Sequence, residues 1–234
     1  MSKIVFFCIP AYGHTNPTIE VVRELVKRGN QVHYYSFYEF RSRIEETGAV
    51  CIPCDDFMPP APKDIDKKVG KDVSSLVDMT VDVTLAMEDK VLGELRAWKP
   101  DCIVSDSICI WGKLYAKKLN VPFVCSTTTF AFNQQTARLM KQSLSELLRM
   151  LSGMPRINAR LRQLRHHGYE IRQFYELLQN DNDTETIVYT SKEFQPMSET
   201  FSDKFTFTGP SIAVPKPSGH KKSRPLVYIS LGTV

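Results

Sequence analysis

The sequence predicts an α/β fold: a doubly wound, mainly parallel, Rossmann-like sheet with helices on both of its faces. Short apolar segments alternate with helical segments from the N-terminus onward, and this order is typical of parallel sheets with right-handed crossovers. The chain has 234 residues, of which 42% are hydrophobic and 24% charged, and this supplies enough apolar material for a globular core. The first strand, loop and helix follow one another within residues 4–28, as in a βαβ unit.

In the first part of the chain, the apolar pattern predicts strands at residues 4–9, 31–37 and 49–52 and helices at residues 18–28 and 39–47. Asn16 is the expected N-cap of the first helix and Pro17 its first residue, because both types favour those positions. Gly29 and Gly48 are expected to end the two helices.

The middle of the chain begins with residues 55–68, which are rich in proline and charge and predict a surface loop. Helices are then expected at residues 73–98, 110–119 and 132–151, with further helical material within 156–179. Strands are expected at residues 101–105, 121–125, 187–189 and 205–207. Trp111 is expected in the core, because a large aromatic side chain buries much area.

The predicted domain organisation has three parts. Residues 1–211 form the Rossmann-like domain. Residues 212–225, with their prolines, glycine and lysines, are typical of an exposed interdomain linker. Residues 226–234 are a strand leading into a glycine turn, which is how a new βα unit starts. The sequence therefore predicts a chain that stops inside the first element of a second domain.

Charge and cysteine content restrict the possible partners and location. The net charge of +4 is too mild to indicate nucleic acid, and no apolar run approaches the roughly 20 residues of a membrane helix. The N-terminus runs directly into a strand without a separate cleavage region, so we expect no signal peptide. Four of the six cysteines lie in or beside apolar segments, so we expect a reduced, cytoplasmic protein. Cys51 and Cys54 have CxxC spacing, but neither a helix start nor a second ligand pair accompanies them, so we expect no redox or zinc site.

The strongest candidate for chemistry is the pair His14 and Asp106. His14 lies in the loop after the first strand, and Asp106 follows the fourth. These strands are neighbours in the common doubly wound order, so their carboxyl ends should bring the two side chains together in the ligand crevice. A carboxylate on one imidazole nitrogen leaves the other free to act as a base. Purely structural roles, a backbone hydrogen bond for His14 and a helix cap for Asp106, stay open.

Several segments together resemble the N-terminal, acceptor-binding domain of nucleotide-sugar-dependent glycosyltransferases with the GT-B fold, especially the macrolide glycosyltransferase group. The first is Pro-Ala-Tyr-Gly-His-Thr-Asn-Pro at residues 10–17. The others lie at residues 37–41, 101–112, 119–122, 126–130 and 228–234. The resemblance covers the whole chain, more weakly over residues 59–99 and 140–185.

The resemblance implies an inverting transfer of a sugar from a nucleotide donor, expected to be UDP-linked, to a hydroxyl of a small hydrophobic acceptor such as a macrolide or phenol. His14 would deprotonate the acceptor and Asp106 would partner His14, with no metal or cofactor required. The implied acceptor contacts are Tyr12, Thr127, Thr128 and Phe130. The implied donor contacts are Gly13, Ser230, Gly232 and Thr233. Without a donor domain, the chain alone is expected to be inactive.

Three alternatives remain beside this interpretation. The same pocket could belong to a small-molecule binding module without chemistry. A dinucleotide-binding Rossmann enzyme is disfavoured, because only Gly13 stands where that fingerprint has three glycines. The basic stretch from Arg156 to Arg172 is either a solvated helix face or a surface for anionic lipid or nucleic acid.

Overall fold

The structure is a computed structural model that describes residues 1–59, 73–139, 144–178 and 182–212. Within them, seven parallel strands form one sheet in the order β3-β2-β1-β4-β5-β6-β7. The strands are β1 (Lys3–Phe7), β2 (Gln31–Ser36), β3 (Val50–Pro53), β4 (Cys102–Asp106), β5 (Phe123–Thr127), β6 (Glu185–Val188) and β7 (Phe205–Phe207). The predicted parallel, doubly wound sheet is confirmed.

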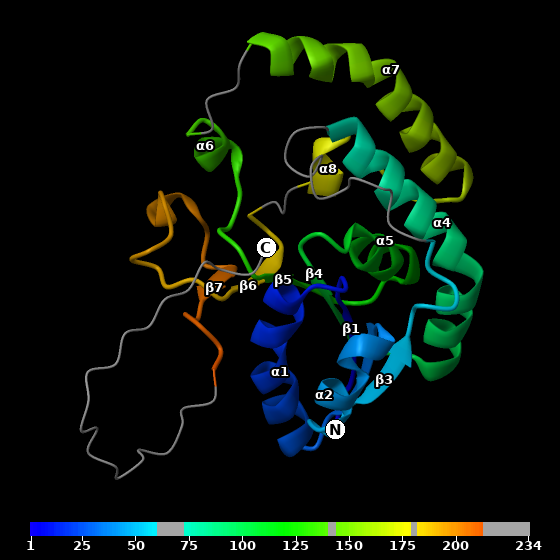
Figure 1. Cartoon of the computed structure of the whole chain (residues 1–234), viewed down its shortest axis with the longest axis vertical. Helices are drawn as coiled ribbons and strands as arrows, with labels where there is room; N and C mark the ends of the chain where they lie inside the picture. The colour runs from blue at the N-terminus through cyan, green and yellow to red at the C-terminus, as the bar shows by residue number, and fades with distance from the viewer. Residues whose placement is uncertain (60–72, 140–143, 179–181, 213–234) are drawn as a thin grey trace, which may run out of the picture.

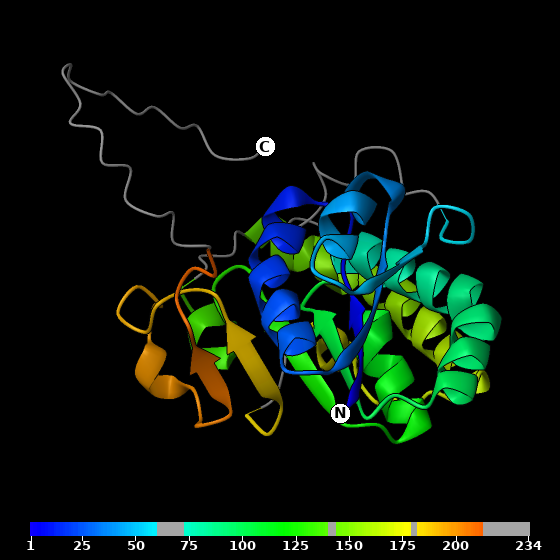
Figure 2. The same ribbon diagram turned by 90° about the horizontal axis from the view of Figure 1, so that it is seen from below.

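Helices cover both faces of this sheet (Figures 1 and 2). One face carries α1 (Tyr12–Lys27) and α2 (Arg41–Glu45). The other carries α4 (Val73–Trp98), α5 (Ile110–Leu119) and α7 (Leu144–His166). The short helices are η1 (Tyr38–Phe40), α6 (Gln134–Ala137), α8 (Tyr175–Leu178) and η2 (Ser198–Thr200). The helices predicted at residues 73–98 and 110–119 are confirmed to the residue.

The two hydrophobic layers follow the alternation of side chains along the central strands. In β1, Val5 and Phe7 pack toward α4 and α5, whereas Phe6 and the following Cys8 pack toward α1. All four residues are at most 4% exposed. Both faces of the strand are therefore buried, as expected for a parallel sheet between helices. Trp111 lies in the first of these layers at 2% exposure, which confirms its predicted place in the core.

The N-terminus of α1 differs from the prediction. The helix begins at Tyr12, and Ala11 precedes it, so Asn16 is not its N-cap and Pro17 lies inside it. The carbonyl of Ala11 accepts the backbone N–H groups of His14 (3.0 Å) and Thr15 (2.9 Å), which starts the helix before the expected N-cap at Asn16. His14 is therefore held on the first turn of a helix rather than in a loop.

A buried chain of hydroxyl groups compensates for Pro17, which lacks the N–H that would bind the Gly13 carbonyl. Tyr34 on β2 lies 2.7 Å from the Thr18 hydroxyl, which donates to the Thr15 carbonyl at 2.8 Å. Burial raises the pKa of Tyr34 well above its usual value, so its hydroxyl stays protonated and donates. These bonds tie the first turns of α1 to the sheet.

The segment after β5 also departs from the prediction of one helix at residues 132–151. The short helix α6 begins at a capping box, in which Asn133 and Thr136 exchange side-chain and backbone hydrogen bonds. The helix α7 then continues through Pro155 to His166. Packing outweighs the local cost of this proline, because Ile157 on α7 is 1% exposed.

Two arginines of the basic stretch on α7 form ion pairs with aspartates of α4. Arg156 and Arg160 form ion pairs with Asp78 on α4, at 2.6 Å and 3.2 Å, and Arg160 also pairs with Asp82. The Arg156 side chain is still 70% exposed, as the interpretation as a solvated face expects, whereas that of Arg160 is only 20% exposed. They join α7 to α4 instead of presenting free charge to a lipid or nucleic acid.

The remaining sequence predictions for this part concern cysteines and the C-terminal segments. Burial raises the pKa of Cys51 to about 11 and also raises that of Cys54, so neither thiol has the thiolate character of a redox motif.

Three predicted segments lie wholly or mostly outside the described residues: residues 60–68 of the surface loop, nearly all of the linker at 212–225, and the strand at 226–234. None of the helices in the described ranges is both long and apolar enough to cross a membrane.

Candidate active site

The candidate site lies at the carboxyl edge of the sheet, where β1 and β4 are adjacent. Phe7 at the end of β1 pairs with Ser105 on β4, so Asp106, the last residue of β4, lies beside the turn that enters α1. Asp106 has the same parity as Val104, which packs on the α1 side of the sheet. The strand pairing therefore aims Asp106 at the first turn of α1, where His14 stands.

The two side chains are in direct contact. His14 Nδ1 lies 2.7 Å from Asp106 Oδ2, and the Asp106 side chain is 1% exposed while that of His14 is 15% exposed. The second carboxylate oxygen, Oδ1, accepts the backbone N–H of Ile108 at 2.9 Å. The approach that strand order predicted is thus present, and each oxygen of the buried carboxylate has a donor.

This arrangement assigns the tautomer of the imidazole. A carboxylate oxygen only accepts, so the neutral ring carries its proton on Nδ1 and donates it to Asp106. The Thr128 hydroxyl lies 3.0 Å from the same nitrogen. Among the residues that the structure describes, none hydrogen-bonds Nε2. The ring therefore presents an unshared lone pair on Nε2, which is the form that accepts a proton from a hydroxyl.

The groups around Asp106 are neutral. Burial, reinforced by the charge of Asp106, raises the pKa of Cys8 to about 12. Burial likewise raises the pKa of Tyr189 to about 12, although a hydrogen bond with Ser126 opposes this. Cys8 therefore stays a thiol near neutral pH and does not compete with His14 as the reactive group.

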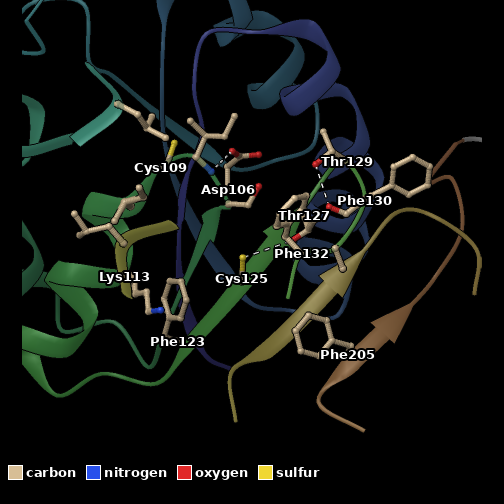
Figure 3. Close-up of a pocket in the computed structure, with 16 residues that line it drawn as sticks. Asp106, Cys109, Lys113, Phe123, Cys125, Thr127, Thr129, Phe130, Phe132 and Phe205 are labelled. Carbon is tan, nitrogen blue, oxygen red and sulfur yellow. Dashed lines mark hydrogen bonds between the residues drawn. The ribbon is translucent and has the colours of Figure 1, made fainter. Parts of the chain in front are cut away.

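A cavity of about 210 Å³ opens beside Asp106 on the α5 side of the sheet (Figure 3). Its apolar wall includes phenylalanines from β5, from the turn after it and from β7, leucines from α4 and α8, and isoleucines at or just before the start of α5: Leu76, Ile108, Ile110, Phe123, Phe130, Phe132, Leu177 and Phe205. Asp106, Thr127 and Lys113 add polar groups. A second hollow, of about 440 Å³, lies on the α1 side and includes Thr128 in its wall.

In sequence, the chain is similar to known glycosyltransferases. No protein-family model matches the chain. The NDP-glycosyltransferase YjiC of Bacillus licheniformis is 33% identical over 242 residues, which span 98% of this chain and 58% of the relative. The demethyllactenocin mycarosyltransferase of Streptomyces fradiae is 31% identical over 255 residues, which span 100% of this chain and 53% of the relative.

Solved structures agree with these relatives. The calicheamicin glycosyltransferase CalG4 matches with a TM-score of 0.67 at 25% identity, over 91% of this chain and 52% of that one. In sequence and in fold, the chain is therefore similar to the N-terminal half of GT-B glycosyltransferases. The glycotransferase of kitacinnamycin has the same fold, with a TM-score of 0.71 at 21% identity, over 96% of this chain and 55% of that one. The chain spans about half the length of the curated relatives it matches, and its fold corresponds to a GT-B N-terminal domain.

The predicted acceptor contacts do not form one group in the structure. Thr127 and Phe130 line the cavity, whereas Thr128 faces His14. Tyr12 lies apart from the cavity: its ring packs edge-on against Phe40 at 5.0 Å. A hydrogen bond with Glu39 raises the pKa of Tyr12. A direct acceptor contact by Tyr12 stays a prediction that this cavity does not support.

The predicted donor contacts are described only in part. Gly13 is exposed in the first turn of α1, directly before His14. Ser230, Gly232 and Thr233 lie outside the described residues. In the ranges that the structure describes, no three side chains of the His, Cys, Asp or Glu type gather as a metal site. A reaction without metal or cofactor stays a prediction.

Sequence reasoning missed most of the apolar wall of the cavity. Phe123 and Cys125 on β5 have the same parity as Thr127, so all three side chains face the α5 side. This alternation was a usable signal once the strand was placed. Phe205 and Leu177 had no such signal, because they reach the cavity through the packing of β7 and α8.

Gly112 on α5 fixes the distance between α5 and the strand that carries Asp106. A Cβ atom there would lie 2.6 Å from Ser105 Cβ and 3.0 Å from the Phe7 ring, and closer still to Ser105 Oγ. Ser105 is itself held, because its hydroxyl donates to the Cys109 carbonyl at 2.7 Å. Gly112→Ala is therefore expected to lower the free energy of unfolding by about 1–3 kcal/mol, as overpacking does. Urea unfolding followed by circular dichroism measures this loss.

Gly93→Ala is the matched control for that experiment. Gly93 lies on α4, and a Cβ atom added there meets nothing within 4 Å. The alanine should stabilise the helix by about 0.5–1 kcal/mol. Equal unfolding midpoints for Gly112→Ala and the unchanged chain would show that the close approach of α5 to β4 carries no strain.

Proposed function

We propose that this chain is the acceptor-binding half of an inverting glycosyltransferase, in which His14 is the general base. The observation that carries the proposal is the state of one imidazole. Its Nδ1 is bound to a carboxylate that is 1% exposed, and its Nε2 is left without a partner among the described residues. That is the arrangement of a base whose tautomer and orientation are fixed.

The proposed step is a single displacement. His14 Nε2 takes the proton of an acceptor hydroxyl as its oxygen attacks the anomeric carbon of the sugar. The bond from that carbon to the nucleoside diphosphate breaks, and the diphosphate leaves with the electron pair. Attack from the side opposite the leaving group inverts the configuration at this carbon. Asp106 stabilises the imidazolium that forms, because its carboxylate already binds Nδ1–H.

The cavity beside Asp106 supports a small apolar acceptor. A cavity of about 150 Å³ is known to hold benzene, so about 210 Å³ accommodates somewhat more than one aromatic ring. The phenylalanine and leucine wall favours rings and aliphatic groups over sugars or peptides. We therefore propose a phenol or the hydroxyl-bearing end of a larger hydrophobic molecule, such as a macrolide, as acceptor.

The proposed donor is a nucleoside diphosphate sugar, with UDP as the nucleotide. The Bacillus licheniformis relative carries this donor class in its name, as an NDP-glycosyltransferase. Within the described residues, Gly13 is the proposed donor contact, because it is exposed in the first turn of α1, where backbone N–H groups lack intrahelical acceptors. We propose that Ser230, Gly232 and Thr233 approach the same diphosphate.

A two-domain protein is needed to test the reaction. We define it as this chain fused to the part of the Bacillus licheniformis relative that extends beyond the matched 58%. With a UDP-sugar and a panel of phenols, the fusion is expected to form the glycoside with inverted configuration, as mass spectrometry and proton NMR of the anomeric centre detect. A retained configuration would contradict the proposed single displacement.

The chain of 234 residues alone is expected to bind the acceptor without turning it over. The base and the cavity lie within residues 1–212, whereas we propose that donor binding needs the second half of the relatives. Calorimetry should detect acceptor binding, and chromatography should find no glycoside after addition of the UDP-sugar. Glycoside formed by the chain alone would refute the proposal that donor binding needs the second half of the relatives.

A further inference from the structure

We propose that Thr128 is a positioning residue for His14. Its hydroxyl oxygen shares the hydrogen bond of the Nδ1–H group with Asp106 and thereby fixes the orientation of the imidazole ring. This inference rests on the proposed role of His14 as base. Thr128 Oγ1 lies 3.0 Å from His14 Nδ1, and Asp106 Oδ2 lies 2.7 Å from the same nitrogen. One N–H group thus faces two oxygen atoms, which is a three-centre hydrogen bond.

The sheet explains why Thr128 reaches this place. Asp106 pairs with Ser126 across β4 and β5, and Val124 and Ser126 share the parity of Thr128. Val124 packs on the α1 side of the sheet, as Val104 does on β4. Thr128, the first residue beyond β5, therefore points to the α1 side, whereas Thr127 points into the apolar cavity.

The two oxygens hold the ring from two different strand ends. Asp106 ends β4 and Thr128 follows β5, so His14 Nδ1 contacts one oxygen atom from each of two neighbouring strand ends. Rotation of the ring about its Cβ–Cγ bond would break both contacts at once. A carboxylate alone permits sliding along its oxygens, and the second acceptor removes that freedom. The consequence is a fixed direction for the Nε2 lone pair.

The direction of the Thr128 hydrogen bond follows from its neighbour. Asp106 Oδ2 only accepts, so the proton lies on Nδ1 and Thr128 Oγ1 accepts as well. In the other tautomer, the lone pair of Nδ1 would face the carboxylate and only the Thr128 hydroxyl would donate to it. Asp106 therefore selects the tautomer, and Thr128, which can accept from Nδ1–H or donate to an Nδ1 lone pair, adds a second contact that fixes the orientation of the ring.

The first test measures how firmly the ring is held in the chain itself, without any turnover. Nuclear magnetic relaxation of carbon-13 in the His14 ring gives its order parameter, and a His14→Ala spectrum assigns His14 among the five histidines. Thr128→Val keeps the shape and removes the hydroxyl. We expect the order parameter of the His14 ring to fall in Thr128→Val, and Thr128→Ser to restore it. A ring held as firmly in Thr128→Val as in the unchanged chain overturns the proposal.

The second test uses the two-domain protein. Thr128→Val should lower kcat about three- to tenfold with KM unchanged, and Thr128→Ser should recover it. Thr206→Val, the same change at an exposed position of β7, should leave both constants unchanged. A rise in KM alone would make Thr128 a substrate contact and overturn the positioning role. If the unchanged fusion forms no glycoside, the proposed function fails, while the order parameter of the His14 ring still decides the role of Thr128.

Discussion

His14→Ala in the two-domain protein is expected to lower kcat by about 10²- to 10⁴-fold, the contribution of a positioned general base. Acceptor binding should survive, because the apolar wall of the cavity comes from β5, β7, α4, α5 and α8 rather than from α1. Initial rates with a saturating UDP-sugar give kcat, and calorimetry on the same variant gives acceptor affinity. The change removes the Nε2 lone pair and leaves the cavity in place.

The control for this variant is His166→Ala, the same substitution at the exposed end of α7. It should retain the activity of the unchanged fusion. A binding module without chemistry would show full acceptor affinity and no turnover in every variant, including the unchanged protein. Retention of most of the turnover in His14→Ala would exclude His14 as the base.

Asp106→Asn is expected to lower kcat by about 10²-fold while the fold stays intact. The amide oxygen can still accept the Ile108 N–H, which now lies 2.9 Å from Oδ1. The amide nitrogen then faces His14 Nδ1 and donates to it, so the ring proton moves to Nε2. The ring loses its free lone pair and also the charge that stabilises the imidazolium.

Asp101→Asn provides the matched control at the opposite end of the same strand. Asp101 precedes β4 and accepts the backbone N–H of Lys3 at 2.8 Å, far from the carboxyl edge. Its substitution should leave turnover unchanged. Nitrogen-15 spectra of Asp106→Asn should show the Nε2–H form as the main species. A variant with the Nδ1–H form and unchanged turnover would contradict the assigned role of Asp106.

The sheet and the His14–Asp106 contact were predictable because both follow from short-range patterns. Apolar segments alternate with helical ones, which indicates a doubly wound sheet, and the common strand order of such sheets places the ends of β1 and β4 side by side. The prediction of the His14–Asp106 contact needed only the positions of these two strand ends. The catalytic role of the pair stays a prediction that the variants above test.

The N-terminus of α1 was mispredicted for a physical reason. Asn16 and Pro17 have strong propensities for the start of a helix, but the Ala11 carbonyl accepts two backbone N–H groups and begins the helix earlier. The buried contact of Tyr34 with Thr18 then supports the turn that Pro17 weakens. Tertiary contacts outweigh local propensity at this point, and a single sequence does not reveal them.

The roles of Thr127 and Thr128 were not separated by sequence reasoning, because strand parity beyond the end of β5 depends on the register with β4. The apolar wall was missed for a different reason. Its residues come from segments far apart in the sequence, such as Phe123 on β5, Leu177 on α8 and Phe205 on β7, and only tertiary packing brings them together. Cavities built from such elements become visible only in the structure.

The most direct test of the account is the dependence of the His14→Ala defect on acceptor acidity. The measurement is kcat/KM of the unchanged and the His14→Ala two-domain proteins over phenols of decreasing hydroxyl pKa. A more acidic hydroxyl needs less help in losing its proton, so the account predicts that the defect shrinks steadily along the series. An equally large defect for every phenol would show that His14 does not act as the base, and would contradict the central claim.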